Sequence, residues 1–86
     1  MTELLYFTAD FCGVCSQQKP VIEEIEEETN INVKTIDVEE NAELANQYNV
    51  QSLPQMVLKE NDQVEQKFTG LTHKHKIVEA ANPTTA

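Results

Sequence analysis

The stretch FTADFCGVC, residues 7–15, decides how this chain folds. Its first residues close an apolar run, Thr2–Thr8, which is apolar on both alternating faces and predicts a central strand covered on both sides. A stripe of isoleucines after the second cysteine predicts a helix that runs to about Thr29, with a kink at Pro20. Cys12 and Cys15 therefore fall at a junction between a strand and a helix.

The chain beyond this junction predicts three more strands and two more helices. Lys34 places the second strand at an edge of the sheet, and Val64 and Phe68 are expected to point inward from the fourth strand. In chain order we expect a strand over Ile31–Val38, a helix over Asn41–Tyr48 that ends in a left-handed Asn49, strands over Gln55–Lys59 and Gln63–Phe68 joined by a turn at Asn61-Asp62, and a helix from an N-cap at Thr72 to about Ala81.

The resulting order, βαβαββα, predicts an α/β fold with a four-stranded mixed sheet flanked by three helices. The first two strands alternate with a helix and are expected to be parallel, whereas the last two form an antiparallel hairpin. With 86 residues, the chain is expected to be one domain over residues 1–82, followed by a frayed tail over residues 83–86.

The composition of the chain excludes several classes of function. A formal net charge of −9 argues against a nucleic-acid partner, because phosphate contacts need a basic patch. No apolar run approaches the roughly 18 residues of a membrane span, and the start lacks the basic segment of a signal peptide, so we expect a cytoplasmic protein without a membrane partner. In a reducing compartment, a lone close pair of cysteines is more often catalytic or metal-binding than structural.

The pair Cys12 and Cys15 forms a C-x-x-C at the start of a helix. Helical residues three apart bring their Cβ atoms within about 5–6 Å, so a small adjustment closes a disulfide. Cys12 would lie at the helix N-terminus, where free N–H groups and the helix dipole stabilise a thiolate. Cys15, one turn deeper, would keep its proton longer, which makes Cys12 the attacking thiol and Cys15 the resolving thiol. Gly13 leaves the approach to the pair open.

Two other interpretations of the pair are open at this point. The cysteines could be buried apolar residues without chemistry, or they could be half of a zinc site completed by His73 and His75. Zinc sites typically combine C-x₂₋₄-C with H-x₃₋₅-H, whereas these histidines are separated by one residue and lie far along the chain. The position of the cysteines after a strand and before a helix favours redox chemistry with no metal and no cofactor.

With these motifs in place, nearly the whole chain resembles the thioredoxin family. FTADFCGVC is similar to the strand and active-site segment of that family, and Lys19-Pro20 to its helix kink. The segment YNVQSLPQ, residues 48–55, resembles its cis-proline loop, and FTG, residues 68–70, its late glycine turn. The resemblance implies a monomeric thiol–disulfide oxidoreductase that reduces disulfide-bearing protein substrates and is recharged by a thioredoxin reductase.

The resemblance also implies a substrate-binding surface around the cysteines. Leu53–Pro54 would be a cis peptide beside the disulfide, with the Leu53 backbone paired to an extended substrate, and Gly70 would let the substrate backbone come close. Gly13 would lie open between the cysteines. An apolar collar would consist of Phe11, Val14, Leu53 and Leu71.

Tyr6 and Asp10 are expected to modulate the pair. Tyr6 stands where most family members have a buried Asp that assists deprotonation of the second cysteine, and a phenol with a pKa near about 10 is a poor base at neutral pH. Tyr6 is therefore expected only to orient a water or the thiol. Asp10 stands where glutaredoxins have a basic residue, which makes a glutathione-dependent reductase the second choice. The alternative from outside the enzymes is a redox-inert or zinc-holding interaction module on the same fold.

Overall fold

The computed structural model describes residues 2–81 and contains the four strands and three helices expected from the sequence. The tail predicted over residues 83–86 lies outside the described residues. Within residues 2–81, no helix combines the length and the apolarity needed to cross a membrane. In chain order the elements are β1 (Thr2–Thr8), α1 (Gly13–Glu28), β2 (Asn32–Asp37), α2 (Ala42–Gln47), β3 (Gln55–Glu60), β4 (Gln63–Thr69) and α3 (Lys74–Ala81).

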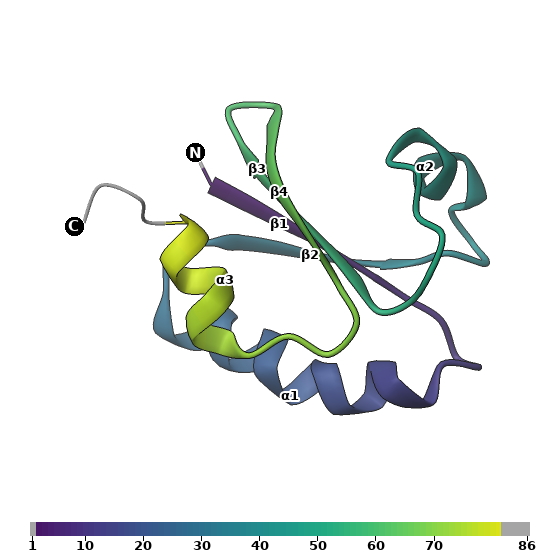
Figure 1. The fold of residues 1–86 in the computed structure, drawn as a ribbon, viewed down its shortest axis with the longest axis horizontal. Helices are drawn as coiled ribbons and strands as arrows, with labels where there is room; N and C mark the ends of the chain where they lie inside the picture. Colours follow the sequence, from purple (N-terminus) through teal and green to yellow (C-terminus); the bar gives the residue numbers. More distant parts are fainter. Residues whose placement is uncertain (1, 82–86) are drawn as a thin grey trace.

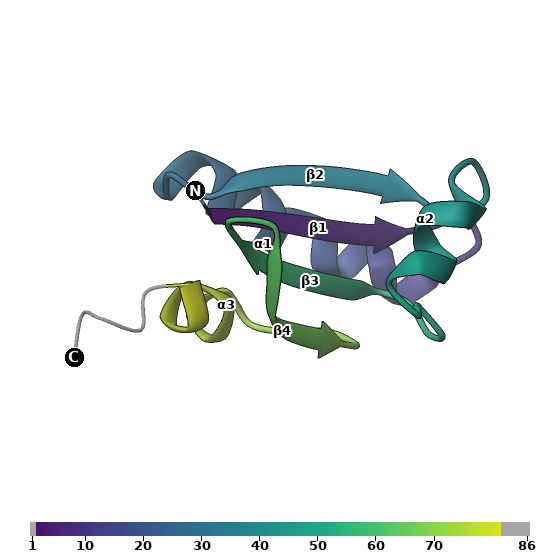
Figure 2. The ribbon, with the colours of Figure 1, turned by 90° about the horizontal axis from the view of Figure 1, so that it is seen from above.

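The four strands form one mixed sheet in the order β2-β1-β3-β4. β1 pairs in parallel with β2 and antiparallel with β3, and β3 and β4 form the expected hairpin. Figure 1 shows α1 and α3 on one face of the sheet and α2 on the other, and Figure 2 shows the strands side by side. The prediction that the strand of Lys34 lies at a sheet edge is confirmed, because β2 pairs only with β1 in this sheet.

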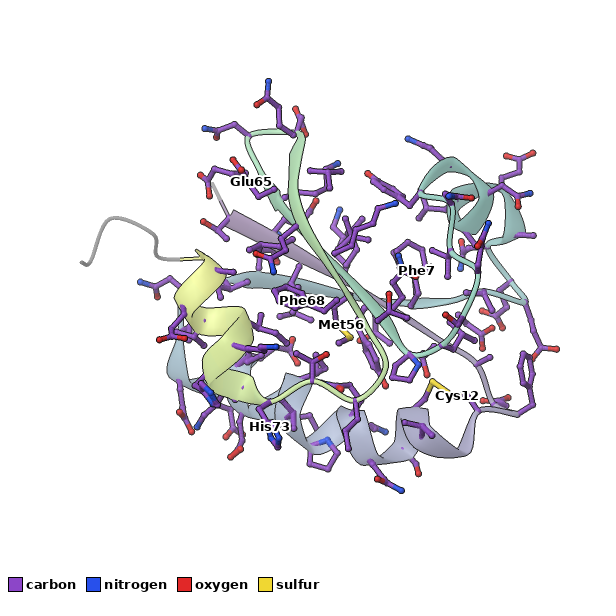
Figure 3. All side chains as sticks on the ribbon, in the orientation of Figure 1. Phe7, Cys12, Met56, Glu65, Phe68 and His73 are labelled. Atoms are coloured by element: carbon purple, nitrogen blue, oxygen red, sulfur yellow. A yellow bond between two sulfur atoms is a disulfide. The ribbon has the colours of Figure 1, made fainter. Side chains whose placement is uncertain are left out.

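β1 is buried on both faces, as its sequence predicts. Leu4 and Tyr6 project toward α1 and α3, where they pack in one core cluster with Met56 and the isoleucines of α1. Leu5 and Phe7 project to the opposite face and pack in a second cluster with residues of α2 (Figure 3). Each of these four β1 side chains is at most 4% exposed. Since burying a large apolar side chain contributes about 1.5–3 kcal/mol, β1 holds helices on both faces of the sheet.

Three non-glycine residues with positive φ mark the turns. Asn49 (φ 56°) follows the helical segment of α2 and turns the chain toward β3, as predicted. Asn61 (φ 52°) and Asp62 (φ 71°) close the hairpin between β3 and β4, also as predicted. Asparagine and aspartate tolerate this left-handed conformation better than most residues do, because their short polar side chains can bond locally.

The prediction that Val64 points into the core is wrong. The pairing of β3 with β4 shifts register between Leu58 and Lys59, which leaves Glu65 as an extra residue on β4. One extra residue reverses the alternation of side chains between the two faces. Phe68, after this bulge, is 6% exposed, whereas Val64, before it, is 46% exposed.

The prediction that Thr72 caps the last helix is also wrong. α3 begins at Lys74, and the Thr72 hydroxyl donates a hydrogen bond to the Gly70 carbonyl (3.0 Å) instead of capping a helix. The backbone N–H of Thr72 donates to the side chain of Gln18 in α1 (2.8 Å). The Thr72 backbone is therefore satisfied by a side chain of another helix, and Thr72 itself does not cap α3.

Tyr48 ties the segment before β3 to the sheet. Its ring packs on Phe7 with the ring centroids 5.9 Å apart, and the Lys59 ammonium lies 5.2 Å from the Tyr48 centroid. The Tyr48 hydroxyl accepts a hydrogen bond from Lys59 (2.7 Å), and this bond raises the pKa of Lys59 against the opposing effect of burial. Lys67 donates to the Tyr48 carbonyl (2.7 Å). These contacts hold the chain that leads into Pro54.

Two substitutions on β4 test the bulge. Phe68→Ala is expected to lower the free energy of unfolding by about 3–5 kcal/mol, because it empties a buried site. Val64→Thr is expected to change it by less than about 0.5 kcal/mol, because Val64 is partly exposed to water. Urea denaturation followed by circular dichroism measures both. A loss above roughly 1 kcal/mol for Val64→Thr would show that this side chain is buried after all.

Candidate functional site

Cys12 occupies the N-cap of α1, as predicted. Its backbone is extended (φ −93°, ψ 105°), and its N–H donates to the Ala9 carbonyl (3.1 Å). Its Sγ accepts a hydrogen bond from the backbone N–H of Cys15 (3.1 Å). Both this bond and the positive end of the helix dipole favour a thiolate at Cys12 once the pair is reduced.

The two cysteines form a disulfide, with their Cα atoms 5.3 Å apart (Figure 3). Cys15 is 3% exposed, whereas Cys12 is only half-buried. Between them, Gly13 has no heavy atom within 4 Å of the place where a Cβ would lie. An incoming group can therefore reach the Cys12 sulfur, while the Cys15 sulfur is covered.

Pro54 and Gly70 meet at the same end of the sheet as the disulfide. The Leu53–Pro54 peptide is cis, as predicted. The Gly70 N–H donates to the Pro54 carbonyl (2.9 Å), which keeps the start of β3 beside the end of β4. Gly70 has φ +82°, a conformation that favours glycine, and the space that a Cβ would enter holds no heavy atom within 4 Å.

Part of the predicted apolar collar gathers beside the disulfide. Phe11, Cys12 and Leu53 line one pocket, whose other walls include apolar side chains from the segments around α2. Phe11 is 73% exposed, and Val14 and Leu71 are also exposed. Leu71 lines a different pocket, formed with the start of α3. The structure thus brings Phe11 and Leu53 together at Cys12, with Leu71 on a neighbouring surface.

Tyr6 lies on β1, and its buried hydroxyl donates to the Cys15 carbonyl (2.8 Å). The phenol proton goes to a backbone oxygen, and the expectation that Tyr6 also orients a water or the thiol stays a prediction. That bond anchors the first turn of α1 to the central strand. A hydroxyl that already donates to a carbonyl is not placed as the base for Cys15, which agrees with the poor basicity of a phenol.

Asp10 is exposed and lines one pocket together with Tyr6 and both cysteines. Its carboxylate also lies close to those of Asp37 and Glu39, with one oxygen of each within 4.8 Å of the others. Together these three acidic groups place negative charge beside Asp10, two residues before Cys12 in the chain. Asp10 thus shares a pocket with the pair, and its modulating role stays a prediction.

The geometry does not favour the zinc interpretation. Both cysteine sulfurs are joined to each other. His73 and His75 instead stack on each other near the start of α3, with their ring centroids 6.0 Å apart (Figure 3 labels His73). Within residues 2–81, no group of potential metal ligands joins either histidine to the cysteines.

Sequence reasoning missed Gln18, which is fully buried and hydrogen-bonded to the backbone of Thr72. Gln18 shares the buried face of α1 with Cys15, Ile22 and Ile25. The spacing of these residues by three or four positions is visible in the sequence. A polar residue inside such an apolar stripe was the available signal, because a buried amide needs hydrogen-bond partners.

Tyr6→Phe tests the anchoring role of the phenol. It is expected to lower the free energy of unfolding by about 1–3 kcal/mol, because the Cys15 carbonyl loses a buried partner. The pH dependence of Cys12 alkylation by iodoacetamide is expected to match the unsubstituted protein, since the phenol is not the base. Urea denaturation and alkylation rates measure the two effects, and a displaced pH profile would contradict a purely anchoring role.

Comparison with known proteins gives consistent matches over most of the chain. The family model described as Thioredoxin matches residues 2–83. The thioredoxin of Listeria monocytogenes is 35% identical over 78 residues, which cover 88% of this chain and 76% of that protein. A bifunctional thioredoxin reductase/thioredoxin of Mycobacterium leprae is 36% identical over 73 residues, covering 83% of this chain and 16% of that protein.

The fold has close counterparts among solved structures. A mutant thioredoxin from Halobacterium salinarum superposes with a TM-score of 0.91 at 33% identity, covering 99% of this chain and 75% of that one. Because the superposition extends over nearly the whole chain, it includes the sheet and the helices on both of its faces. Fold, motif and cysteine geometry therefore agree with one another.

Proposed function

Since this chain belongs to the thioredoxin family and is a thiol–disulfide oxidoreductase, we propose that Cys12 is its attacking thiol and Cys15 its resolving thiol. The observation that carries this assignment is the difference in access between the two sulfurs. Cys12 is half-buried at the N-cap of α1, and Cys15 is buried one turn deeper. Only the more accessible sulfur can meet a disulfide on another protein.

The reaction transfers two electrons from the reduced pair to a substrate disulfide. The Cys12 thiolate attacks one substrate sulfur, which forms a mixed disulfide, breaks the substrate S–S bond and releases the other substrate sulfur as a thiolate that takes up a proton. Cys15 then loses its proton and attacks the Cys12 sulfur. This second step forms the Cys12–Cys15 disulfide and releases the second substrate thiol. The disulfide form described above is the oxidised product of this cycle.

The substrate is proposed to lie across the surface around Cys12. Phe11 and Leu53 line the pocket beside the sulfur and offer apolar contact. The open space at Gly13 and Gly70 admits a backbone at close range. An extended substrate segment that pairs with the Leu53 backbone, next to Pro54, would bring its disulfide to Cys12.

Val14 completes the exposed apolar surface on the helix side. Apolar contacts of this kind are not directional, so one surface can accept many disulfide-bearing sequences. Specificity for a disulfide would then come from the chemistry of Cys12 and from the backbone pairing, and less from the identity of individual substrate side chains.

A thioredoxin reductase is the proposed source of electrons. The Mycobacterium leprae relative joins a thioredoxin and a thioredoxin reductase in one chain, which supports such a partnership for this protein. We propose that the protein works as a monomer in the cytoplasm and carries electrons from the reductase to its targets, because one chain supplies both cysteines and the surface around them. The glutathione-dependent alternative is not favoured by the family match.

Insulin reduction tests the roles of the two cysteines. Cys12→Ser is expected to abolish turnover, because no attacking thiolate remains, whereas Cys15→Ser is expected to accumulate a mixed disulfide that non-reducing electrophoresis detects. Turbidity of the released insulin chains measures the rate. A mixed disulfide trapped by Cys12→Ser, and none by Cys15→Ser, would reverse the assignment.

As a control for the reductant, glutathione alone is expected to recharge the oxidised protein far more slowly than a thioredoxin reductase does.

The rate of alkylation tests whether the helix N-terminus activates Cys12. In the Cys15→Ser variant only one thiol reacts, and the backbone N–H at position 15 still reaches the Cys12 sulfur. Its iodoacetamide rate is expected to titrate well below the value of about 8.5 for free cysteine. A profile that follows free cysteine would remove the argument from the helix dipole and the N–H donor.

A further inference from the structure

Gln18 makes a paired contact that the redox chemistry alone does not require. Its Nε2 donates to the Thr72 carbonyl (3.1 Å), and the Thr72 N–H donates to its Oε1 (2.8 Å). Gln18 is 0% exposed and Thr72 is 7% exposed. The side-chain amide thus binds both backbone groups of a residue 54 positions away in the sequence, much as one strand pairs with another.

We propose that Gln18 is a positioning residue that holds the turn at Gly70 against α1 and so sets how tightly a protein substrate binds. This inference rests on the proposed function, because it concerns the surface on which that substrate would lie. Gln18 sits one helical turn beyond Cys15 on the same buried face of α1. Its contact therefore links the helix that carries the cysteines to the turn on the far side of Pro54.

A continuous series of hydrogen bonds runs through this turn. The Gly70 N–H donates to the Pro54 carbonyl (2.9 Å), and the Gly70 carbonyl accepts from the Thr72 hydroxyl (3.0 Å). Gln18 then binds both backbone groups of Thr72. The turn is consequently fixed at one end to the start of β3 and at the other end to α1.

This arrangement explains why a polar side chain occupies an apolar stripe. Residues 70–73 are irregular, lying between β4 and α3, so no strand or helix supplies partners for the Thr72 backbone. A buried backbone group without a partner is strongly unfavourable, and Gln18 supplies a donor and an acceptor together. An apolar residue at position 18 would leave the turn free to move away from the cysteines.

Gln18→Met tests the proposal, because methionine has a similar length and cannot form either hydrogen bond. The KM for insulin is expected to rise by about threefold or more, since a displaced turn weakens substrate binding. Reduction of 5,5′-dithiobis(2-nitrobenzoate), a small disulfide that does not need an extended surface, is expected to keep its rate. The reduction potential of the Cys12–Cys15 pair is also expected to stay the same.

Gln17→Met is the matched control, because it makes the same chemical change at the exposed neighbouring position of α1. Amide hydrogen exchange at Thr72 gives a direct readout, with protection expected in the unsubstituted protein and in Gln17→Met and loss of protection in Gln18→Met. If Gln18→Met does not fold, Gln18→Asn takes its place, since the shorter amide stays neutral but does not reach both backbone groups of Thr72; a smaller rise in KM is then expected.

Three results would overturn the proposal. An unchanged KM for insulin in a folded variant at position 18 would show that the contact between Gln18 and Thr72 does not act on substrate binding. An equal loss with insulin and with the small disulfide would point to damage at the cysteines. An unprotected Thr72 amide in the unsubstituted protein would show that the contact between Gln18 and Thr72 does not persist in solution. Inactivity of the unsubstituted protein toward insulin would instead count against the proposed function.

Discussion

The register of three strands decides where the chemistry of this protein takes place. Phe7 of β1 lies opposite Gln55 of β3, which lies opposite Thr69 of β4, so one row of residues crosses the sheet. Just beyond that row, β1 runs into the segment before α1, β3 begins after Pro54, and β4 ends before Gly70. The hydrogen bond from Gly70 to Pro54 continues the row past the strands. Because β1 ends at this edge, α1 must begin there and present its N-terminus.

At the cysteine pair, short-range dipoles outweigh the net charge of the protein. The chain carries a formal charge of −9, which by itself would oppose a thiolate. The acidic run of α1, however, starts at Glu23, roughly 16 Å along the helix axis from Cys12 at a rise of about 1.5 Å per residue. That separation exceeds the screening length of about 8 Å at physiological ionic strength. The Cys15 N–H, by contrast, lies 3.1 Å from the Cys12 sulfur and is not screened. Asp10 lines the same pocket as both cysteines, and Asp37 and Glu39 lie beside it.

Several of the features that the sequence predicted correctly are local ones. The double-faced apolar run of β1, the left-handed Asn49 and the hairpin turn at Asn61-Asp62 depend on residues that are neighbours in the chain. The features that it predicted wrongly depend on distant partners. Val64 faces water because β3 and β4 shift register at Glu65, and alternation read along one strand contains no information about its partner. Thr72 has the residue type of a helix cap, but its backbone binds Gln18 from another helix.

The same division holds at the site. The sequence by itself determined that two thiols three residues apart would meet at the start of a helix, because helical spacing and strand-to-helix order are properties of consecutive residues. Only the tertiary structure decided what surrounds them. It placed the Tyr6 hydroxyl on the Cys15 carbonyl and brought Leu53 beside Cys12. Those contacts join segments that are separate in the chain, and packing between the helices and the sheet selects which of the possible partners meet.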